Sequence, residues 1–473
     1  MYTIDKVYID GEMATPHGEE LFDLYSPTTG AVIGRLRLAD QIDAHRAVDA
    51  AARAFPSFST TPKAERVALL RRLHAAIMAR ADELRDATVQ EYGGLFGASN
   101  WRVSMAADSF LSAAAALETY EFTQVFGATR VIREAVGVAG LITPWNNNIG
   151  SISTKLAAAL AAGCTTVLKP SELSGLQSSL LTECFHAAEV PPGVINVVTG
   201  RGEVVGAELS ASPKVAKISF TGSTAVGKAI LRGGAETMKR VTLELGGKSP
   251  TVVLEDADLD KAVALAIAAG FGNSGQACVN GTRILVPEGL GEAFCAKLKI
   301  AVEAMKVGDP AEPDTVIGPL VNRTQLERVE RYIQRGIQEG AEVVTGGPGR
   351  PEGLPGGFFV KPTVFAKVTN AMSIAQEEIF GPVVAVITYR TEDEAVAIAN
   401  DTIYGLQAYV ISADTERARR VAARLQAGRI VLNGAPHDPH APFGGFKQSG
   451  IGREYGVFGL ESFTEVKAVL APA

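Results

Sequence analysis

Apolar runs and helical repeats alternate along this chain, and the alternation predicts an α/β fold. Residues 136–146 (VGVAGLITPWN) are typical of a buried strand that Pro144 ends, and residues 153–163 (STKLAAALAAG) are typical of the following helix. Residues 215–234 (VAKISFTGSTAVGKAILRGG) repeat the pattern as strand, glycine turn and helix. Such units indicate a parallel sheet with helices on both faces. The alternation resumes after residue 245, so we expect two α/β layers in series.

Two segments depart from this alternation. Residues 119–136 (TYEFTQVFGATRVIREAV) predict an exposed hairpin, and residues 461–470 (ESFTEVKAVL) alternate like an edge strand. Both segments either pair between subunits or pack on their own chain, and the sequence leaves the two alternatives open.

Composition narrows the class of protein. The 473 residues are 47% hydrophobic and 21% charged, as in ordinary globular proteins of two or three domains, and the net charge of −7 argues against nucleic-acid binding. The four cysteines lack C-x-x-C spacing, which argues against a disulfide framework and a structural zinc site. No signal peptide or membrane-spanning run is evident, so we expect a cytoplasmic protein with no membrane partner and no metal.

Two glycine-rich turns compete as phosphate-binding loops. Residues 270–275 (GFGNSG) spell G-x-G-x-x-G, but they follow an alanine-rich helix rather than a strand. Residues 220–227 (FTGSTAVG) lie between a strand and a helix, where Gly222 permits close approach of a phosphate. Ala229 occupies the position where a P-loop needs a hydroxyl for Mg²⁺, so a metal-dependent NTPase is disfavoured. A plain strand–helix connection remains the alternative for this turn.

Three polar residues are candidates for catalysis. Cys278 lies in a polar, glycine-rich bend (NSGQACVNG), which suits an accessible thiol. Glu244 stands between leucines at a strand end, where burial would raise its pKa and suit it to general-base work. Asn146 follows a strand and can offer its amide to a developing oxyanion. Taken singly, each also fits a structural role: a loop cysteine, a salt-bridged carboxylate and a turn-forming asparagine.

Seven motifs in order resemble the aldehyde dehydrogenase superfamily of the NAD(P)-dependent, non-acylating type. They are TPWN, LKPSE, FTGSTAVG, LELGGKSP, GQAC, EEIFGPV and PFGGFKQSGIGRE, and they run over nearly the whole chain. The most specific element is the pair LELGG and GQAC, in which Cys278 follows Glu244 by 34 residues.

The resemblance implies a covalent mechanism. Cys278 would attack the aldehyde carbon, and its backbone N–H and the Asn146 side chain would hold the oxyanion. After hydride transfer to the nicotinamide, Glu244 would activate the water that hydrolyses the thioester. Lys155 and Glu454 match positions of a proton relay, although ion pairing explains them equally well.

The resemblance also implies the cofactor contacts. The residues that match them are Trp145, Lys169, Ser171, Glu172, Gly222, Ser223, Leu245, Glu378 and Phe380. A carboxylate at Glu172 accepts from ribose hydroxyls and repels a 2′-phosphate, which favours NAD over NADP.

The implied fold is a Rossmann-like cofactor domain, a second α/β catalytic domain and a small β oligomerisation arm in a homodimer or homotetramer. The expected boundaries are 1–117, 137–245 and 448–462 for the cofactor domain, 118–136 and 463–473 for the arm, and 246–447 for the catalytic domain.

The substrate tunnel departs from many members of the family. The residues expected to line it are Asn147, Ser151, Thr154, Ala277, Val279, His437 and Asp438. The small hydroxyl side chains of Ser151 and Thr154 predict a wider or more polar tunnel. No arginine lies in the stretch after Asn146, which weakens an assignment to succinic-semialdehyde-type substrates.

Three rival functions remain to be separated. An acylating enzyme that passes the thioester to coenzyme A tends to lack the base, so Glu244 argues against it. A cysteine acyl-hydrolase needs a histidine beside its thiol, and none stands in a motif of that kind. The joint presence of Cys278, Glu244 and Asn146 argues against a catalytically silent member of the fold.

Overall fold

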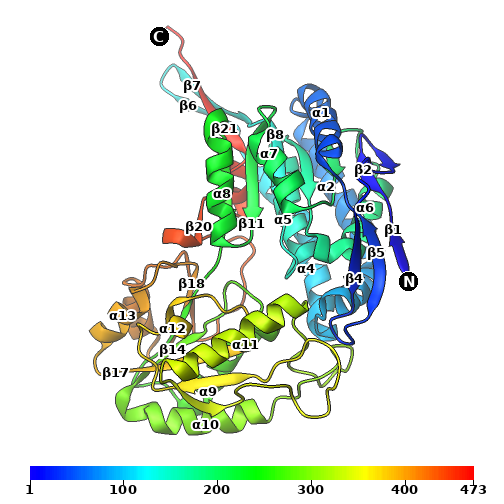
Figure 1. Cartoon of the computed structure of the whole chain (residues 1–473). Helices are drawn as coiled ribbons and strands as arrows, with labels where there is room; N and C mark the ends of the chain where they lie inside the picture. Colours follow the sequence, from blue (N-terminus) through cyan, green and yellow to red (C-terminus); the bar gives the residue numbers. More distant parts are fainter. Residues whose placement is uncertain (473) are drawn as a thin grey trace.

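The computed structural model describes residues 1–472, which form two large sheets with helices packed on them and a smaller β arm (Figure 1). The first sheet has the strand order β20-β12-β11-β8-β9-β10-β2-β3. Its strands are β2 (Val7–Ile9), β3 (Glu12–Ala14), β8 (Val138–Ile142), β9 (Thr165–Lys169), β10 (Ile195–Val197), β11 (Val215–Thr221), β12 (Arg240–Glu244) and β20 (Gly450–Ile451). The five strands from β12 to β10 run parallel, as the strand–helix alternation predicts.

Helices cover both faces of this sheet because successive side chains of each strand point to opposite sides. Leu141 of β8 and Leu168 of β9 belong to one apolar cluster, while their neighbours Ile142 and Val167 belong to another. One face packs against α2 (Lys63–Met78), α4 (Phe96–Thr119), α5 (Asn148–Ala162) and α6 (Gly175–Ala187). The other packs against α1 (Gln41–Phe58), α7 (Ala207–Ala211) and α8 (Thr224–Gly234).

The second sheet confirms the expected second α/β layer. Its order is β15-β16-β17-β14-β13-β18-β19. The strands are β13 (Pro250–Val253), β14 (Arg283–Pro287), β15 (Glu342–Thr345), β16 (Thr363–Ala366), β17 (Val383–Tyr389), β18 (Gln407–Ile411) and β19 (Arg429–Leu432). Its helices are α9 (Leu259–Phe271), α10 (Gly291–Glu303), α11 (Arg323–Gln338), α12 (Ser373–Gln376), α13 (Glu392–Asn400) and α14 (Thr415–Ala422).

The predicted hairpin and the terminal strand lie together in a three-stranded sheet of order β21-β7-β6. The hairpin is β6 (Thr123–Phe126) and β7 (Thr129–Ala135), and β21 (Thr464–Val469) pairs antiparallel with β7. The tail therefore pairs with the hairpin of its own chain, and the arm extends from the body beside the C-terminus (Figure 1). Residue 473, the last of the expected arm, lies outside the described residues.

The remaining elements lie around the first sheet. A small sheet of order β1-β5-β4 contains β1 (Tyr2–Ile4), β4 (Leu21–Tyr25) and β5 (Val32–Arg37). Two short helices are α3 (Ala81–Ala87) and α15 (Gly456–Glu461). Within residues 1–472, no helix combines the length and apolar character needed to cross a membrane.

Candidate active site

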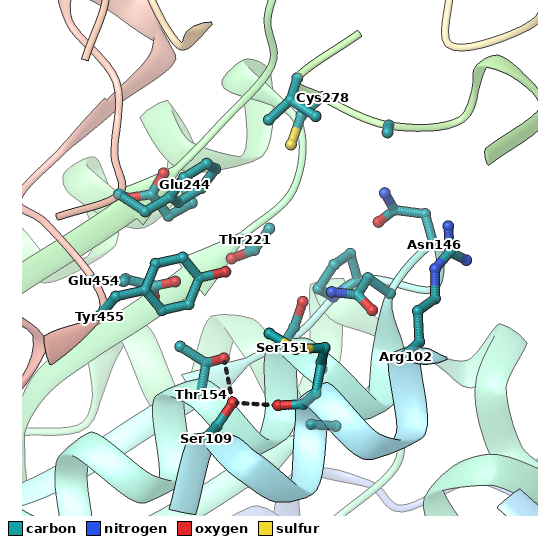
Figure 2. Close-up of a pocket in the computed structure, with 18 of the residues that line it drawn as sticks. Arg102, Ser109, Asn146, Ser151, Thr154, Thr221, Glu244, Cys278, Glu454 and Tyr455 are labelled. Carbon is teal, nitrogen blue, oxygen red and sulfur yellow. Dashed lines mark hydrogen bonds between the residues drawn. The ribbon is translucent and has the colours of Figure 1, made fainter. Parts of the chain in front are cut away.

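A cavity of about 830 Å³ opens where the carboxyl ends of strands of the first sheet face loops of the second α/β part (Figure 2). The ends of β8, β11 and β12 contribute Asn146, Thr221 and Glu244 to its wall, and the loop after α9 contributes Cys278. Ligands bind outside the carboxyl ends of parallel strands in open α/β sheets because the connecting loops leave a crevice there. The topology therefore explains why side chains far apart in sequence share one cavity.

The loop that carries Cys278 has an irregular backbone. Asn273 and Ser274, in the middle of GFGNSG, adopt left-handed conformations with φ of 57° and 53°. A Cβ on Gly275 would lie 2.0 Å from the carbonyl carbon of Gly381, so only glycine fits this close approach. The G-x-G-x-x-G pattern thus lies at the carboxyl end of α9 and forms the turn that leads the chain into the cavity.

Hydrogen bonds join this loop to the TPWN segment. Asn146 Nδ2 donates to the Gln276 carbonyl oxygen at 3.0 Å. Asn273 Nδ2 donates to the carbonyl oxygens of Asn146 at 3.3 Å and of Gln276 at 3.0 Å. These bonds hold the Asn146 amide beside the cysteine loop, where one amide hydrogen remains for a ligand.

The thiol of Cys278 is partly exposed to the cavity and is not an ordinary surface thiol. Burial raises its pKa to about 12, and the carboxyl groups of Glu378 and Glu244 act in the same direction. The backbone N–H groups of Cys278 and Val279 face the sulfur and partly oppose this rise. At neutral pH Cys278 is therefore a thiol that needs a base or a nearby cation before it can attack.

Glu244 is buried at the end of β12, as its leucine neighbours predict. It is 2% exposed, and neither carboxyl oxygen has a hydrogen-bond partner. Burial raises its pKa well above the ordinary value, and Glu454 raises it further, while Lys155 and Arg453 lower it. A buried carboxyl group with unused oxygens on a cavity wall can accept a proton from water or thiol.

Lys155 and Glu454 form a buried ion pair behind this carboxyl group. Lys155 Nζ lies 2.5 Å from Glu454 Oε1 and donates to Ser219 Oγ at 3.2 Å. Glu454 reaches the cavity wall, whereas Lys155 is 1% exposed and lies outside the lining. Glu454 thus connects the cavity wall to the buried ammonium group of Lys155.

The expected cofactor residues fall into two groups. Those that line the cavity are Trp145, Gly222, Ser223, Leu245, Glu378 and Phe380. Lys169, Ser171 and Glu172 lie outside the lining, at the end of β9, where Glu172 is 3.5 Å from Lys169 and 3.9 Å from Arg201. Ser223 caps α8 by accepting the N–H of Val226, so the glycine turn opens a helix beside the cavity.

Six of the seven expected tunnel residues line the cavity. They are Asn147, Ser151, Thr154, Ala277, Val279 and His437. Asp438, the seventh, is not part of the cavity wall, and its contact with substrate stays a prediction. Its carboxylate instead closes a turn by accepting the N–H of His440 at 2.9 Å.

Helix α4 forms a wall of the cavity that the sequence motifs do not include. Arg102, Met105 and Ser109 follow one another at helical spacing along this wall, and Ser109 Oγ lies 3.4 Å from Thr154 Oγ1 of α5. The stretch after Asn146 contains no arginine, as expected, but three arginines line the cavity: Arg102, Arg328 and Arg429. The periodicity of α4 is the signal that could have identified this face.

The described part of the chain contains no cluster of side chains that could bind a metal ion. Residues 1–472 contain no group of three or more His, Cys, Asp or Glu side chains arranged to hold a metal ion. His437 faces Tyr455, with ring centroids 5.5 Å apart, rather than a ligand set.

Comparison with known proteins agrees with this geometry. The model of the aldehyde dehydrogenase family matches residues 14–469. The chain belongs to the aldehyde dehydrogenase family. A putative aldehyde dehydrogenase of Staphylococcus aureus strain MSSA476 is 45% identical over 466 residues, which is 98% of each chain.

Solved structures of the family superpose closely on this chain. A mutant of aldehyde dehydrogenase C from Pseudomonas syringae, in complex with NAD⁺ and octanal, has a TM-score of 0.98 and 45% identity, covering 99% of this chain and 97% of that one. A Mycobacterium tuberculosis aldehyde dehydrogenase with NAD⁺ has a TM-score of 0.96 and 41% identity, covering 99% and 98%. The family resemblance and the α/β fold expected from the motifs are both confirmed.

Proposed function

We propose that this protein oxidises an aldehyde to the carboxylic acid with NAD, through a covalent intermediate on Cys278. One observation carries the proposal: the Cys278 thiol, the unpartnered carboxyl group of Glu244 and the oriented amide of Asn146 line the same cavity. A nucleophile, a base and an oxyanion donor are the three groups that acyl chemistry on a thiol requires.

In this proposal Cys278 attacks the carbonyl carbon, and Asn146 stabilises the charge that develops on the oxygen. Because Gln276 and Asn273 hold the TPWN segment against the cysteine loop, the amide is fixed before substrate arrives. The raised pKa of the thiol means that it must lose its proton on binding, and Glu244 or the positive charge of the cofactor would favour that loss.

Glu244 then removes a proton from the water that hydrolyses the thioester. Burial keeps the pKa of this carboxyl group high enough for it to accept a proton near neutral pH. The pair of Lys155 and Glu454 lies behind it and would pass the proton onward, a role we keep as a proposal for both residues. A free base at this position also argues against an acylating enzyme, in which coenzyme A replaces water.

The residues along the cavity fit NAD, whose nicotinamide accepts the hydride. Ser223 caps the amino end of α8 at the cavity wall, where the first turn of this helix would bind the pyrophosphate. Glu378 and Phe380 would hold the nicotinamide riboside. A Cβ on Gly246 would lie 2.5 Å from Glu378 Oε2, so glycine there makes room for the carboxylate. Lys169, Ser171 and Glu172 would bind the adenosine ribose, with Glu172 favouring NAD over NADP.

We extend the proposal to assembly, domains and location. The arm leaves β6 and β21 as sheet edges within the described residues, and a homodimer or homotetramer would cover them. The domain boundaries given above stay a prediction, as does a cytoplasmic location.

Mixing the purified protein with NAD and a panel of aldehydes tests the proposal. We expect NADH and the carboxylic acid in equal amounts without coenzyme A. Release of acid without NADH would indicate a hydrolase instead, and a requirement for coenzyme A would indicate the acylating enzyme.

A further inference from the structure

The wall that α4 contributes carries an arginine, Arg102, that has no carboxylate partner within residues 1–472. Arg102 lies one turn before Met105 and two turns before Ser109 on the face that lines the cavity, and Figure 2 places it on the same side of the pocket as Asn146. It is partly buried and lies beside the hydroxyl group of the buried Tyr92, and in the described part of the chain it forms no ion pair. A guanidinium has five donors, so those that do not face Tyr92 remain available to a ligand.

The carboxyl groups of the same cavity do not pair with Arg102. Asp108 lies 3.4 Å from His74, and Glu454 pairs with Lys155. Glu378 accepts the backbone N–H of Gly247 at 3.0 Å, and neither carboxyl oxygen of Glu244 has a hydrogen-bond partner. None of these four carboxyl groups forms an ion pair with Arg102, which therefore has no carboxylate partner among the described residues, 1–472.

We propose that the substrate carries a carboxylate at the end remote from its aldehyde, and that Arg102 binds this carboxylate. The planar fork of a guanidinium matches a carboxylate in a bidentate geometry, and partial burial strengthens such a bond relative to one in water. The hydroxyl groups of Ser109, Ser151 and Thr154 line the same cavity and provide polar contacts for the chain of the substrate. The substrate class is thus ω-oxo carboxylates, an inference that rests on the proposed aldehyde oxidation.

A second cavity arginine provides the matched control. Arg429, at the start of β19, lies near His437 and Tyr455, and it likewise forms no ion pair with residues 1–472. It lies by the loop of residues 433–443 rather than on the α4–α5 wall with its hydroxyl groups. We therefore assign the carboxylate to Arg102 and expect Arg429 to contribute little.

The test compares ω-oxo carboxylates of increasing length with the uncharged n-alkanals of the same carbon number. In the wild type, kcat/KM should favour the oxo acid at the matching length. Arg102→Gln should lower kcat/KM for the oxo acid by roughly 10- to 100-fold, mainly through KM, because a hydrogen-bonded ion pair is lost. The same variant should change kcat/KM for the alkanal by less than about twofold, and Arg102→Lys should recover part of the loss.

Inhibition provides a readout that does not depend on turnover of the charged substrate. The α,ω-dicarboxylate of matching length should inhibit alkanal oxidation by the wild type and lose this effect in Arg102→Gln. Equal losses for both substrates in Arg102→Gln, a wild-type preference for alkanals at every length, or a larger loss in Arg429→Gln would each overturn the inference while leaving aldehyde oxidation intact. Failure of the wild type to form NADH with any aldehyde would instead overturn the proposed function.

Discussion

Cys278 is the residue on which the proposed chemistry depends most directly. Cys278→Ser should abolish aldehyde oxidation, because an alcohol is a far poorer nucleophile than a thiolate, while NAD binding measured by calorimetry should persist. Cys295→Ala is the matched control, since Cys295 packs beside the core of the second α/β part, away from the cavity. The buried Cys164 and Cys184 should also tolerate alanine without a large loss of kcat. Substantial turnover by Cys278→Ser would show that another residue attacks.

Glu244 and Cys278 are expected to act in different steps of the reaction, so their variants should lose activity in different ways. Glu244→Gln should still transfer hydride and give a burst of a single equivalent of NADH, after which turnover falls by roughly 10²–10⁴-fold. Intact-protein mass spectrometry should then detect the acyl group on Cys278. Loss of the burst would mean that Glu244 is needed earlier, to deprotonate the thiol whose pKa burial raises to about 12.

Glu172 is the residue we expect to decide between the two cofactors. Its carboxylate lies 3.5 Å from Lys169 and 3.9 Å from Arg201, so Glu172→Ser removes a negative charge and leaves both cations for a 2′-phosphate. The ratio of kcat/KM for NADP to that for NAD should rise. Glu20→Ser, which alters the other partner of Arg201, should change this ratio less. A wild type that already prefers NADP would contradict the assignment.

At the scale of single elements, the side chain of Asp43 joins the amino end of α1 to the loop that contains His17 and Gly18. Asp43 is fully buried and accepts the backbone N–H groups of His17 at 2.9 Å, Gly18 at 3.1 Å and Asp40 at 3.2 Å. Asp43→Ala would leave three backbone donors without this acceptor, and the one of Gly18 is buried.

This substitution should lower the free energy of unfolding in urea by about 2–4 kcal/mol. The matched control on the same helix is Asp49→Ala, which removes an exposed pair with Lys214 and should cost less than about 1 kcal/mol. Equal effects of the two variants would refute the structural role given to Asp43.

The elements themselves were largely predictable from the pattern of the chain. Strands such as β8 and β11 are apolar because both faces are covered, and the glycine turn before α8 lies where strand and helix meet. Residues 63–92 form three successive helical segments, α2, α3 and a π-helical turn (Thr88–Tyr92), and the polypeptide turns at Ala79 and Arg80 between the first two. Periodicity indicates which face of a segment is apolar, but it does not determine where neighbouring elements interrupt it.

At the scale of the whole molecule, the arm exposes apolar side chains along its two outer strands. Val125 and Phe126 of β6 are 65% and 62% exposed, and Val466 of β21 is 52% exposed. Phe126→Asp should weaken or abolish the homo-oligomer, as measured by light scattering after gel filtration, because a charge would enter the interface core.

Ile300→Asp is the control for this prediction, since Ile300 is 70% exposed on α10 and lies outside the arm. It should leave the mass of the oligomer unchanged. A monomeric wild type, or dissociation by Ile300→Asp alone, would contradict an interface built on the arm.

Sequence by itself determined the layers, the family motifs and the pairing of Glu244 with Cys278, because each depends on short-range pattern or on residue identity. Tertiary structure alone decided that β21 pairs with β7, that Asp438 closes a turn with His440 and that Arg102 lines the cavity. The physical reason is the same in each case. These placements depend on which elements pack together, as α4 does on α5 through Ser109 and Thr154, and periodicity shows the faces of a helix without showing which element each face contacts.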